Sequence, residues 1–326
     1  MPSPFATDCA DTFAQRGEAY LLDSLDRWLG QDARLLEPFA RRDDAAVLAL
    51  DVPPDFKVVK AADSLVFGIH FETTASPEQA AHKLLRRNLS DFAAMGAWPT
   101  SALLTLFLAP NVSVRWLEGF FTALGRDARR FDVTIAGGDV SSATEGTFAA
   151  SLFLSGHAEK PIARGRSQPG ETLWVTGELG GSLRGRHLDF EPRLEEGRWL
   201  AQRSEVTSMI DLSDGLASDL PKLLGAGRAA RIDAARLPMS ADAHALSKQS
   251  DRSALDHACC DGEDYELAFT LAVDASTEVF STAWKETLPT RLSRIGDVVP
   301  VGSDGACLLD AGGGPLPVGS GYQHGG

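Results

Sequence analysis

Basic residues are in deficit in this chain of 326 residues. Its 31 Lys and Arg stand against 45 Asp and Glu, which gives a formal net charge of −14 and a pI near 4.9. Nucleic-acid binding depends on clustered Lys and Arg, and the Arg residues here are scattered. The composition therefore argues against a nucleic-acid partner. An acidic protein that handles a phosphorylated substrate would need metal ions to offset the repulsion.

Long apolar runs are also missing. The most apolar long run, SALLTLFLA at 101–109, is far shorter than the roughly 20 residues that cross a bilayer. The first residues, MPSPFATDCADTF, contain no basic segment followed by an apolar segment, which is the pattern of a secretory signal. We therefore expect a cytoplasmic protein with no membrane partner.

Cysteine is scarce and poorly spaced for metal or disulfide chemistry. The four cysteines are Cys9, Cys259, Cys260 and Cys307, and no two of them form a CxxC pair. This spacing fits neither a disulfide framework nor a zinc site, and partly buried thiols are the simpler interpretation.

The first half of the chain alternates between strand and helix patterns, which predicts an α/β or α+β fold. Apolar residues recur near one face of a helix at 77–95, with Pro77 at its start, and a second amphipathic helix is expected at 115–131. The expected strands are 47–52, 64–71, 101–109 and 148–156.

A connector rich in Gly, Pro and charge, ARGRSQPGE at 163–171, precedes a second α/β half. We place the boundary near residue 160, which gives an amino-terminal domain at 1–160 and a carboxy-terminal domain at 161–326. The strands expected in the second half are 172–177, 206–212, 229–233 and 265–273, and the helical stretches are 182–203, 213–224 and 276–286.

Aspartates recur in short segments flanked by small residues, and each of them lies where an expected strand or helix changes into a loop. Side chains from distant segments can converge at such places, and Mg²⁺ prefers oxygen ligands. For any single aspartate, a turn or a solvated surface carboxylate is an equally simple role, and Ser213 alone would be an ordinary helix N-cap. The set is Asp43, Asp44, Asp63, Asp91, Asp139, Asp211 and Asp214.

One of these aspartates follows two glycines. Gly137-Gly138-Asp139 comes after the expected strand at 132–136, so glycine amides could approach phosphate oxygens while Asp139 holds a metal. A structural turn is the alternative for this segment. The chain has no GxxxxGK[ST] loop and no HRD or DFG segment, which excludes P-loop enzymes and protein kinases.

In chain order, several segments together resemble thiamine-monophosphate kinases, which share a superfamily with aminoimidazole ribonucleotide synthetase. The resemblance runs from about Gly17 to Tyr322. The segments are RRDDAAVL, DSLVFGIHF, NLSDFAAMGAWP, GGDV, RGRSQPGETLWVTGELG, EPRLEEG, MIDLSDGLASDL and GEDYELAFT.

The resemblance implies a two-domain aminoimidazole ribonucleotide synthetase-like fold. Its amino-terminal domain would bind ATP and Mg²⁺, and its amino-terminal sheet would complete a barrel-like interface in a homodimer. The implied reaction moves the γ-phosphoryl group of ATP onto thiamine monophosphate, giving thiamine diphosphate by direct in-line transfer. Mg²⁺ assists this transfer, and no side chain acts as a nucleophile.

The resemblance also assigns roles to individual positions. On general grounds His70 is a packed core histidine and Glu263 caps or solvates a strand edge, so their substrate roles come from the resemblance. The metal positions are Asp44, Asp63, Asp91, Asp139, Asp211 and Asp214. The nucleotide positions are Gly138, Asp139, Arg164 and Ser213, and the thiamine positions are His70, Glu263 and Tyr322.

The chain departs from the family pattern at several of these sites. Ala61-Ala62 replaces a hydroxyl-bearing pair before Asp63, and Arg42 replaces a glycine. Loss of the hydroxyls deletes at least one potential oxygen ligand of one metal site, although a backbone carbonyl could remain a ligand there. Val140 follows Asp139, and Asp261 stands where the family has glycine, so we expect Asp261 at a left-handed backbone position.

Two other interpretations of the function stay open. One is a different ATP-using enzyme of the superfamily, although Cys9 has no Lys beside it and the chain ends HGG without a terminal cysteine. The other is a non-catalytic protein that binds a nucleotide or a thiamine phosphate. The departures at Arg42 and Ala61-Ala62 favour the binder, and retention of all six acidic metal positions favours the kinase.

Overall fold

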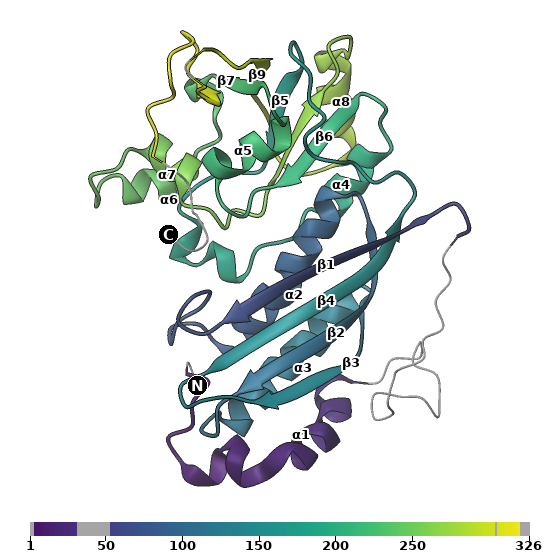
Figure 1. The fold of residues 1–326 in the computed structure, drawn as a ribbon, viewed down its shortest axis with the longest axis vertical. Helices are drawn as coiled ribbons and strands as arrows, with labels where there is room; N and C mark the ends of the chain where they lie inside the picture. The colour runs from purple at the N-terminus through teal and green to yellow at the C-terminus, as the bar shows by residue number, and fades with distance from the viewer. Residues whose placement is uncertain (1–2, 31–52, 304, 320–326) are drawn as a thin grey trace. The chain divides into compact units, whose positions relative to one another are not determined.

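The computed structural model describes residues 3–30, 53–303 and 305–319. The chain forms two compact units with α-helices and β-strands in both (Figure 1), so the α/β class is confirmed. The division into domains at 1–160 and 161–326, each with its own role, stays a prediction. Unit 1 comprises Met1–Leu89, Trp98–Glu159 and Leu188–Glu191, and unit 2 comprises Ser90–Ala97, Lys160–His187 and Pro192–Gly326.

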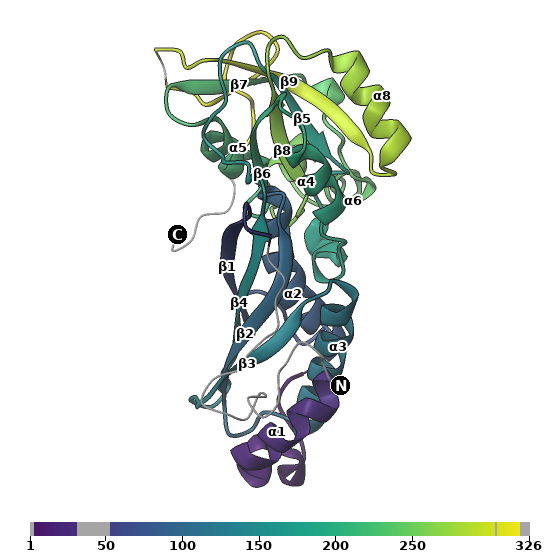
Figure 2. The same cartoon turned by 90° about the vertical axis from the view of Figure 1, so that its right-hand side faces the viewer.

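Unit 1 is built on a four-stranded sheet in the order β1-β4-β2-β3, in which only the β2–β3 pair is parallel. Its helices α2 and α3 lie on one face of this sheet (Figures 1 and 2). The strands are β1 (Lys57–Val66), β2 (Trp98–Leu108), β3 (Thr134–Ser142) and β4 (Phe148–Ala158). The helices are η1 (Cys9–Asp11), α1 (Phe13–Leu29), α2 (Pro77–Ala94) and α3 (Val114–Arg130).

Helices α2 and α3 form where the apolar spacing predicted them. Helix α2 begins at Pro77, whose fixed φ suits a first helical residue. Helix α3 begins after Ser113, whose side chain accepts a hydrogen bond from the Trp116 backbone N–H. In α2 the apolar residues with no exposed surface are those that the pattern placed on one face: Ala80, Ala81, Leu84, Leu85, Leu89, Phe92 and Ala93.

The two faces of the unit 1 sheet differ in exposure. Leu104 and Leu152 point toward the helices and are at most 5% exposed. Their neighbours along the strands point the other way, and Leu103 is 50%, Phe107 42% and Phe153 47% exposed. The face opposite the helices is therefore apolar and open to solvent at these positions.

Unit 2 contains a six-stranded sheet in the order β10-β7-β9-β5-β8-β6, with a buried apolar core around α5. Its strands are β5 (Thr172–Thr176), β6 (Val206–Asp211), β7 (Arg228–Ile232), β8 (Leu267–Leu271), β9 (Leu292–Pro300) and β10 (Leu308–Leu309). Its α-helices are α4 (Leu194–Ala201), α5 (Leu216–Leu224), α6 (Ala241–Leu246), α7 (Ala254–Cys260) and α8 (Thr277–Thr287). Short 3₁₀ turns are η2 (Ser182–Arg184), η3 (Arg186–Leu188) and η4 (Ala234–Arg236).

Three predicted elements differ from the structure. The strand expected at 64–71 ends at Val66, because the chain turns at Gly68, which has a φ of +80°. The helical stretch expected at 182–203 consists of two 3₁₀ turns and the short α4. Helix α5 begins at Leu216 with Gly215 as its N-cap, so Ser213 is not the cap. The strand expected at 47–52 lies outside the described residues.

Within the described part of the chain, no helix combines the length and the apolar character needed to cross a bilayer.

Candidate functional site

Two loops of unit 2 are joined by backbone hydrogen bonds. The β6–α5 loop carries the DLSDG segment, and the α7–β8 loop carries DGEDYE. The Glu263 amide donates to the Ser213 carbonyl at 2.7 Å, and the Tyr265 amide donates to the Leu212 carbonyl at 2.9 Å. The predicted nucleotide residue Ser213 and the predicted substrate residue Glu263 therefore lie side by side.

Two predicted metal positions belong to the segment that ends β6. Asp211 is buried, and its Oδ2 accepts a hydrogen bond of 2.8 Å from Ser90 Oγ. Ser90 directly precedes Asp91 in α2, and all of these residues belong to unit 2. The structure thus brings together the segments that carry Asp91, Asp211 and Asp214.

A lysine neutralises part of this acidic segment. Lys222 Nζ lies 2.7 Å from Asp214 Oδ2 and 2.9 Å from Asp219 Oδ1. Burial raises the pKa of Asp219 above its ordinary value, against the opposing effect of Lys222. Burial by itself would lower the pKa of Lys222, but its hydrogen bonds to the two carboxylates raise it overall. The ammonium group therefore stays charged beside Asp214.

The α7–β8 loop has a strained backbone. Glu263 has a φ of 55° and Tyr265 a φ of 53°, in the left-handed region that residues with a side chain seldom adopt. The backbone carbonyl of Glu263 accepts a hydrogen bond from Ser182 Oγ at 2.6 Å. The side-chain Oε2 of Glu263 lies 2.8 Å from His187 Nδ1. His187 therefore orients the predicted substrate carboxylate. No sequence pattern indicates this role, because a lone histidine between Arg186 and Leu188 fits no motif.

The next acidic residue of this loop, Asp264, is buried and holds the loop in place through its contacts. Asp264 accepts from the Gly180 amide at 2.9 Å and pairs with Arg186 at 2.7 Å. Burial raises the pKa of its carboxyl group to about 8 despite these favourable contacts. Glu266 is likewise held by Arg193, with N–O distances of 2.7 and 2.6 Å. The acidic residues that alternate with Glu263 and Tyr265 thus fix the loop to the rest of unit 2.

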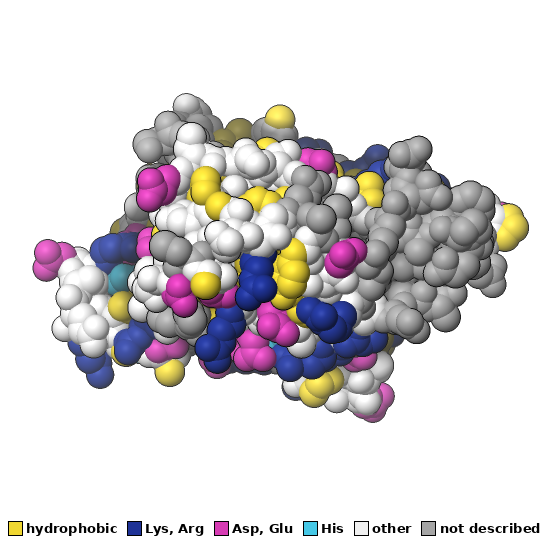
Figure 3. Space-filling model, turned by 90° about the horizontal axis from the view of Figure 1, so that it is seen from below, with side chains coloured by type: hydrophobic (Ala, Val, Ile, Leu, Met, Phe, Trp, Pro, Cys, Tyr) yellow, Lys and Arg dark blue, Asp and Glu magenta, His cyan; other side chains and the backbone are white. Residues whose placement is uncertain are grey.

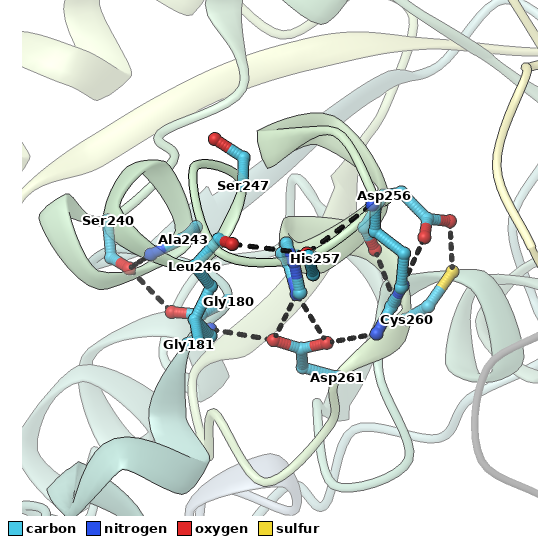
Figure 4. A network of polar contacts seen from close by, with 12 residues as sticks. Gly180, Gly181, Ser240, Ala243, Leu246, Ser247, Asp256, His257, Cys260 and Asp261 are labelled. Carbon is cyan, nitrogen blue, oxygen red and sulfur yellow. Dashed lines mark hydrogen bonds and ion pairs between the residues drawn. The ribbon is translucent and has the colours of Figure 1, made fainter.

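A polar network beside this loop includes Asp261 (Figure 4). Its carboxylate lies 3.0 Å from His257 Nδ1, and it accepts from Arg252 at 2.8 Å and from the Gly181 amide at 3.2 Å. Asp261 has a φ of −69°, whereas Gly262 has a φ of +73°. The expectation of a left-handed Asp261 is therefore wrong, because the positive φ falls on the glycine that follows it.

Asp63 and Asp139, the predicted metal positions of unit 1 that the structure describes, lie on opposite edge strands of its sheet. Asp63 is on β1, where it pairs in register with Leu152 of β4. Leu152 pairs with Leu104 of β2, which pairs with Gly138 of β3. Three strand spacings, about 14 Å in total, separate Asp63 from the strand of Asp139. These two carboxylates do not meet.

The Gly137-Gly138-Asp139 segment lies inside β3, so the alternative of a structural turn is wrong. Gly138 is needed for close approach, since a Cβ atom there would lie 1.7 Å from the Leu104 carbonyl oxygen. Asp139 is exposed and accepts a hydrogen bond of 2.9 Å from Ser141.

The remaining predicted positions have diverse surroundings. His70 Nδ1 accepts from the Val66 amide at 2.9 Å, and the His70 carbonyl accepts from Lys83 Nζ at 2.6 Å, so the side chain stabilises the turn after β1. Arg164 is exposed in the connector of unit 2. Asp44 and Tyr322 lie outside the described residues.

The side chains of the candidate residues can be compared with the ligands that Mg²⁺ prefers. Within the residues that the structure describes, no group of three or more His, Cys, Asp or Glu side chains is placed to hold a metal ion. The candidates Asp91, Asp211 and Asp214 nevertheless offer only carboxylate oxygens, which is the donor chemistry that Mg²⁺ prefers together with water and phosphate oxygens. Asp63 and Asp214 each have a cation beside the carboxylate, Arg87 at 3.4 Å and Lys222 at 2.7 Å.

Comparison with known sequences identifies related proteins. Residues 42–158 match the family described as AIR synthase related protein, N-terminal domain. The thiamine-monophosphate kinase of Rhodopirellula baltica is 38% identical over 266 residues, which cover 79% of this chain and 82% of that protein.

Comparison with solved structures agrees on the fold. The thiamine-monophosphate kinase of Stenotrophomonas maltophilia superimposes with a TM-score of 0.74 at 29% identity, covering 91% of this chain and 96% of that chain. A structure described as AaThiL complexed with AMPPCP and TMP has a TM-score of 0.70 at 24% identity, covering 95% and 97% of the two chains. The predicted two-domain fold of the aminoimidazole ribonucleotide synthetase type is therefore confirmed.

Proposed function

This chain belongs to the thiamine-monophosphate kinase family, and on that premise we propose that it transfers the γ-phosphoryl group of ATP to thiamine monophosphate. The products are ADP and thiamine diphosphate. One observation carries the proposal: the Glu263 amide donates to the Ser213 carbonyl at 2.7 Å. This bond holds the acidic DLSDG segment against the loop proposed to bind thiamine.

The transfer needs no nucleophilic side chain. An oxygen of the thiamine monophosphate phosphate attacks the γ-phosphorus of ATP, and the bond to the β–γ bridging oxygen breaks with its electron pair, which leaves on ADP. Both reactants are anions, so the main demands on the protein are positioning and charge stabilisation. Bound Mg²⁺ would supply the charge that screens the phosphates. The residues proposed to hold it are the six positions that the family resemblance assigns: Asp44, Asp63, Asp91, Asp139, Asp211 and Asp214.

The other groups of unit 2 suit the acceptor. Thiamine carries a permanent positive charge on its thiazolium ring, and the Glu263 carboxylate has the opposite sign. His187 contacts that carboxylate at 2.8 Å, and the strained backbone of Glu263 is held by hydrogen bonds on both sides. A preorganised carboxylate binds a cation without first losing side-chain entropy. We therefore assign Glu263 to thiamine binding and His187 to positioning Glu263.

We also propose that the protein is a cytoplasmic homodimer. Cys259 and Cys260 are free buried thiols, and burial raises the pKa of Cys260 to about 12, which suits a protein kept in a reducing compartment. The apolar side chains on the open face of the unit 1 sheet would be covered if two such sheets met.

An assay of thiamine diphosphate formation tests the proposed function. The purified protein is incubated with ATP, Mg²⁺ and thiamine monophosphate, and the products are separated by chromatography. We expect thiamine diphosphate and ADP in equal amounts, and we expect Asp91→Asn and Asp139→Ala to lower the rate at least about 100-fold, as loss of transition-state charge stabilisation does. Nucleotide binding without product would instead support the non-catalytic binder, and wild-type rates in Asp139→Ala would remove that residue from the site.

A further inference from the structure

The α7–β8 loop is tied to the start of η2 by hydrogen bonds from two consecutive residues. Gly181 is the N-cap of η2 and Ser182 is its first residue, and both are buried. The Gly181 amide donates to Asp261 Oδ2 at 3.2 Å, and the Ser182 hydroxyl donates to the Glu263 backbone carbonyl at 2.6 Å. A buried donor without an acceptor costs free energy, so these bonds hold the two segments together. The start of η2 thus connects the carboxylate of Asp261 with the backbone of Glu263.

Three N–H donors converge on the Asp261 carboxylate (Figure 4). Its Oδ1 accepts from Arg252 Nη1 at 2.8 Å, and its Oδ2 accepts from the Gly181 amide. His257 Nδ1 lies 3.0 Å from both oxygens and must carry a proton, because an ionised carboxylate can only accept. The Asp261 side chain is only 6% exposed. A buried carboxylate with these donors around it has one stable orientation, and in that orientation Oδ2 faces Gly181.

The backbone of Glu263 needs support of this kind because it is strained. Glu263 has a φ of 55° and follows Gly262, which has a φ of +73°. A residue with a side chain stays in the left-handed region only where the surrounding structure determines its conformation. The Glu263 amide is bonded to the Ser213 carbonyl, and the Glu263 carbonyl is bonded to Ser182 Oγ. Loss of the bond to Ser182 would let this peptide rotate, and the Glu263 carboxylate would move with it.

We propose that Asp261 is a positioning residue for the thiamine monophosphate acceptor. It acts through Gly181 and Ser182, which keep Glu263 in the strained conformation that aims its carboxylate. The inference rests on the proposed function, since it takes Glu263 as the group that faces the thiazolium cation. Loss of the Asp261 carboxylate therefore weakens binding of the acceptor, while nucleotide affinity and kcat stay nearly unchanged.

Titration calorimetry with thiamine monophosphate tests the proposal without turnover. Asp261→Ala removes the acceptor of the Gly181 amide, so we expect about tenfold weaker binding of thiamine monophosphate and less than about a twofold change for the non-hydrolysable ATP analogue AMPPCP. Asp261→Asn keeps one oxygen for Gly181 and loses the charge that faces Arg252. It should bind thiamine monophosphate within about threefold of the wild type.

Arg252→Ala is the matched control, because it removes the same ion pair and leaves the bond to Gly181 in place. It should also bind thiamine monophosphate within about threefold of the wild type. Wild-type affinity in Asp261→Ala overturns the proposal. Equally weak binding by Asp261→Asn and Asp261→Ala also overturns it, because the ion pair would then matter and not the acceptor of the Gly181 amide.

Ser182→Ala gives a second test that leaves the buried charge of Asp261 in place. It removes the bond to the Glu263 carbonyl, so we expect hydrogen exchange at the Glu263 amide to become about tenfold faster, as in Asp261→Ala. Unchanged exchange at Glu263 in Ser182→Ala contradicts the proposal. A wild type that binds thiamine monophosphate but forms no thiamine diphosphate counts against the proposed function alone. Product formation by Asp261→Ala with an unchanged KM for thiamine monophosphate counts against this inference alone, and a wild type that binds no thiamine monophosphate overturns both.

Discussion

Asp264, a buried residue of the α7–β8 loop, makes the stability of the protein depend on pH. Burial raises the pKa of its carboxyl group to about 8, well above the value of roughly 4 in an unfolded chain. Between these values the folded state binds more protons than the unfolded state, so stability falls as pH rises. The contribution of Asp264 is fully present below about pH 4 and is lost as pH rises through about 8.

We expect Asp264→Asn to flatten this dependence. Denaturant unfolding at about pH 5 and about pH 8 should show a smaller loss of unfolding free energy in Asp264→Asn than in the wild type, with a slope difference of at most about 1.4 kcal/mol per pH unit. The exposed Asp251→Asn is the matched control and should follow the wild type. An unchanged slope in Asp264→Asn would show that the protein does not use this carboxyl group in its neutral form.

At the residue scale, the sequence was enough to find the acidic loops but not the residues that contact their carboxylates. Asp211, Asp214 and Glu263 could be singled out because each lies in a short segment with small residues. Their partners His187 and Lys222 could not, because a hydrogen bond between distant segments leaves no local pattern. The neighbour of Asp63 was also hidden, since Arg87 reads as an ordinary helix-surface cation until α2 packs on β1.

Strand β3 illustrates the element scale. Its sequence, TIAGGDVSS, contains two consecutive glycines, and Ala136 is bulged, because Ala102 pairs with Ile135 and Leu103 with Gly137. Glycine has a low propensity for strands, so the sequence indicated that this strand ended at Ala136, before Gly137. The structure continues the strand, because pairing with β2 requires a residue without a side chain at 138. Strand β9 was missed for a similar reason, since Gly296 interrupts its pattern and lies close to the Arg231 carbonyl.

The two glycines of β3 offer a matched test. A Cβ at Gly138 would lie 1.7 Å from the Leu104 carbonyl oxygen, whereas a Cβ at Gly137 meets nothing within 4 Å. We expect Gly138→Ala to lower the unfolding free energy by about 1–3 kcal/mol by forcing β2 and β3 apart, and Gly137→Ala to change it by less than about 0.5 kcal/mol. Guanidinium chloride unfolding measures both. Equal stabilities for the two variants would refute the close approach of β3 to β2.

Elements with a strong period were predictable to within a few residues. Helices α2 and α3 and strands β2, β4 and β5 lie where the apolar spacing placed them, because burial on one face decides both the pattern and the fold. The 3₁₀ turns between β5 and α4 were not predictable, since η2 is bounded by glycines with positive φ rather than by an apolar stripe.

At the scale of the whole molecule, charge and apolar surface point to different partners. The face in Figure 3 shows Lys and Arg side chains lying beside Asp and Glu side chains, which does not make a continuous basic surface there. With a net charge of −14, the chain must bind anionic substrates through local cations rather than through its overall field. The apolar face of the unit 1 sheet, by contrast, suits a protein partner of the same kind.

A charge placed on that face should separate the proposed dimer. Phe153 is 47% exposed on the open face of the sheet, and Phe153→Asp would place two like charges in a desolvated contact. We expect the variant to elute as a monomer in size-exclusion chromatography with light scattering, while the wild type gives the mass of a dimer. Val273→Asp, at an exposed site of unit 2, should leave the dimer intact. A dimeric Phe153→Asp would place the interface elsewhere.

The central claim is that this chain moves a phosphoryl group from ATP to a phosphate acceptor. Its most direct test is a single incubation with ATP labelled in the γ-phosphate, Mg²⁺ and thiamine monophosphate. We predict that the label appears in the terminal phosphate of thiamine diphosphate, in one-to-one ratio with ADP, and that no label stays on the protein. Label that is found only in ATP, or only in free orthophosphate, would contradict the proposed function.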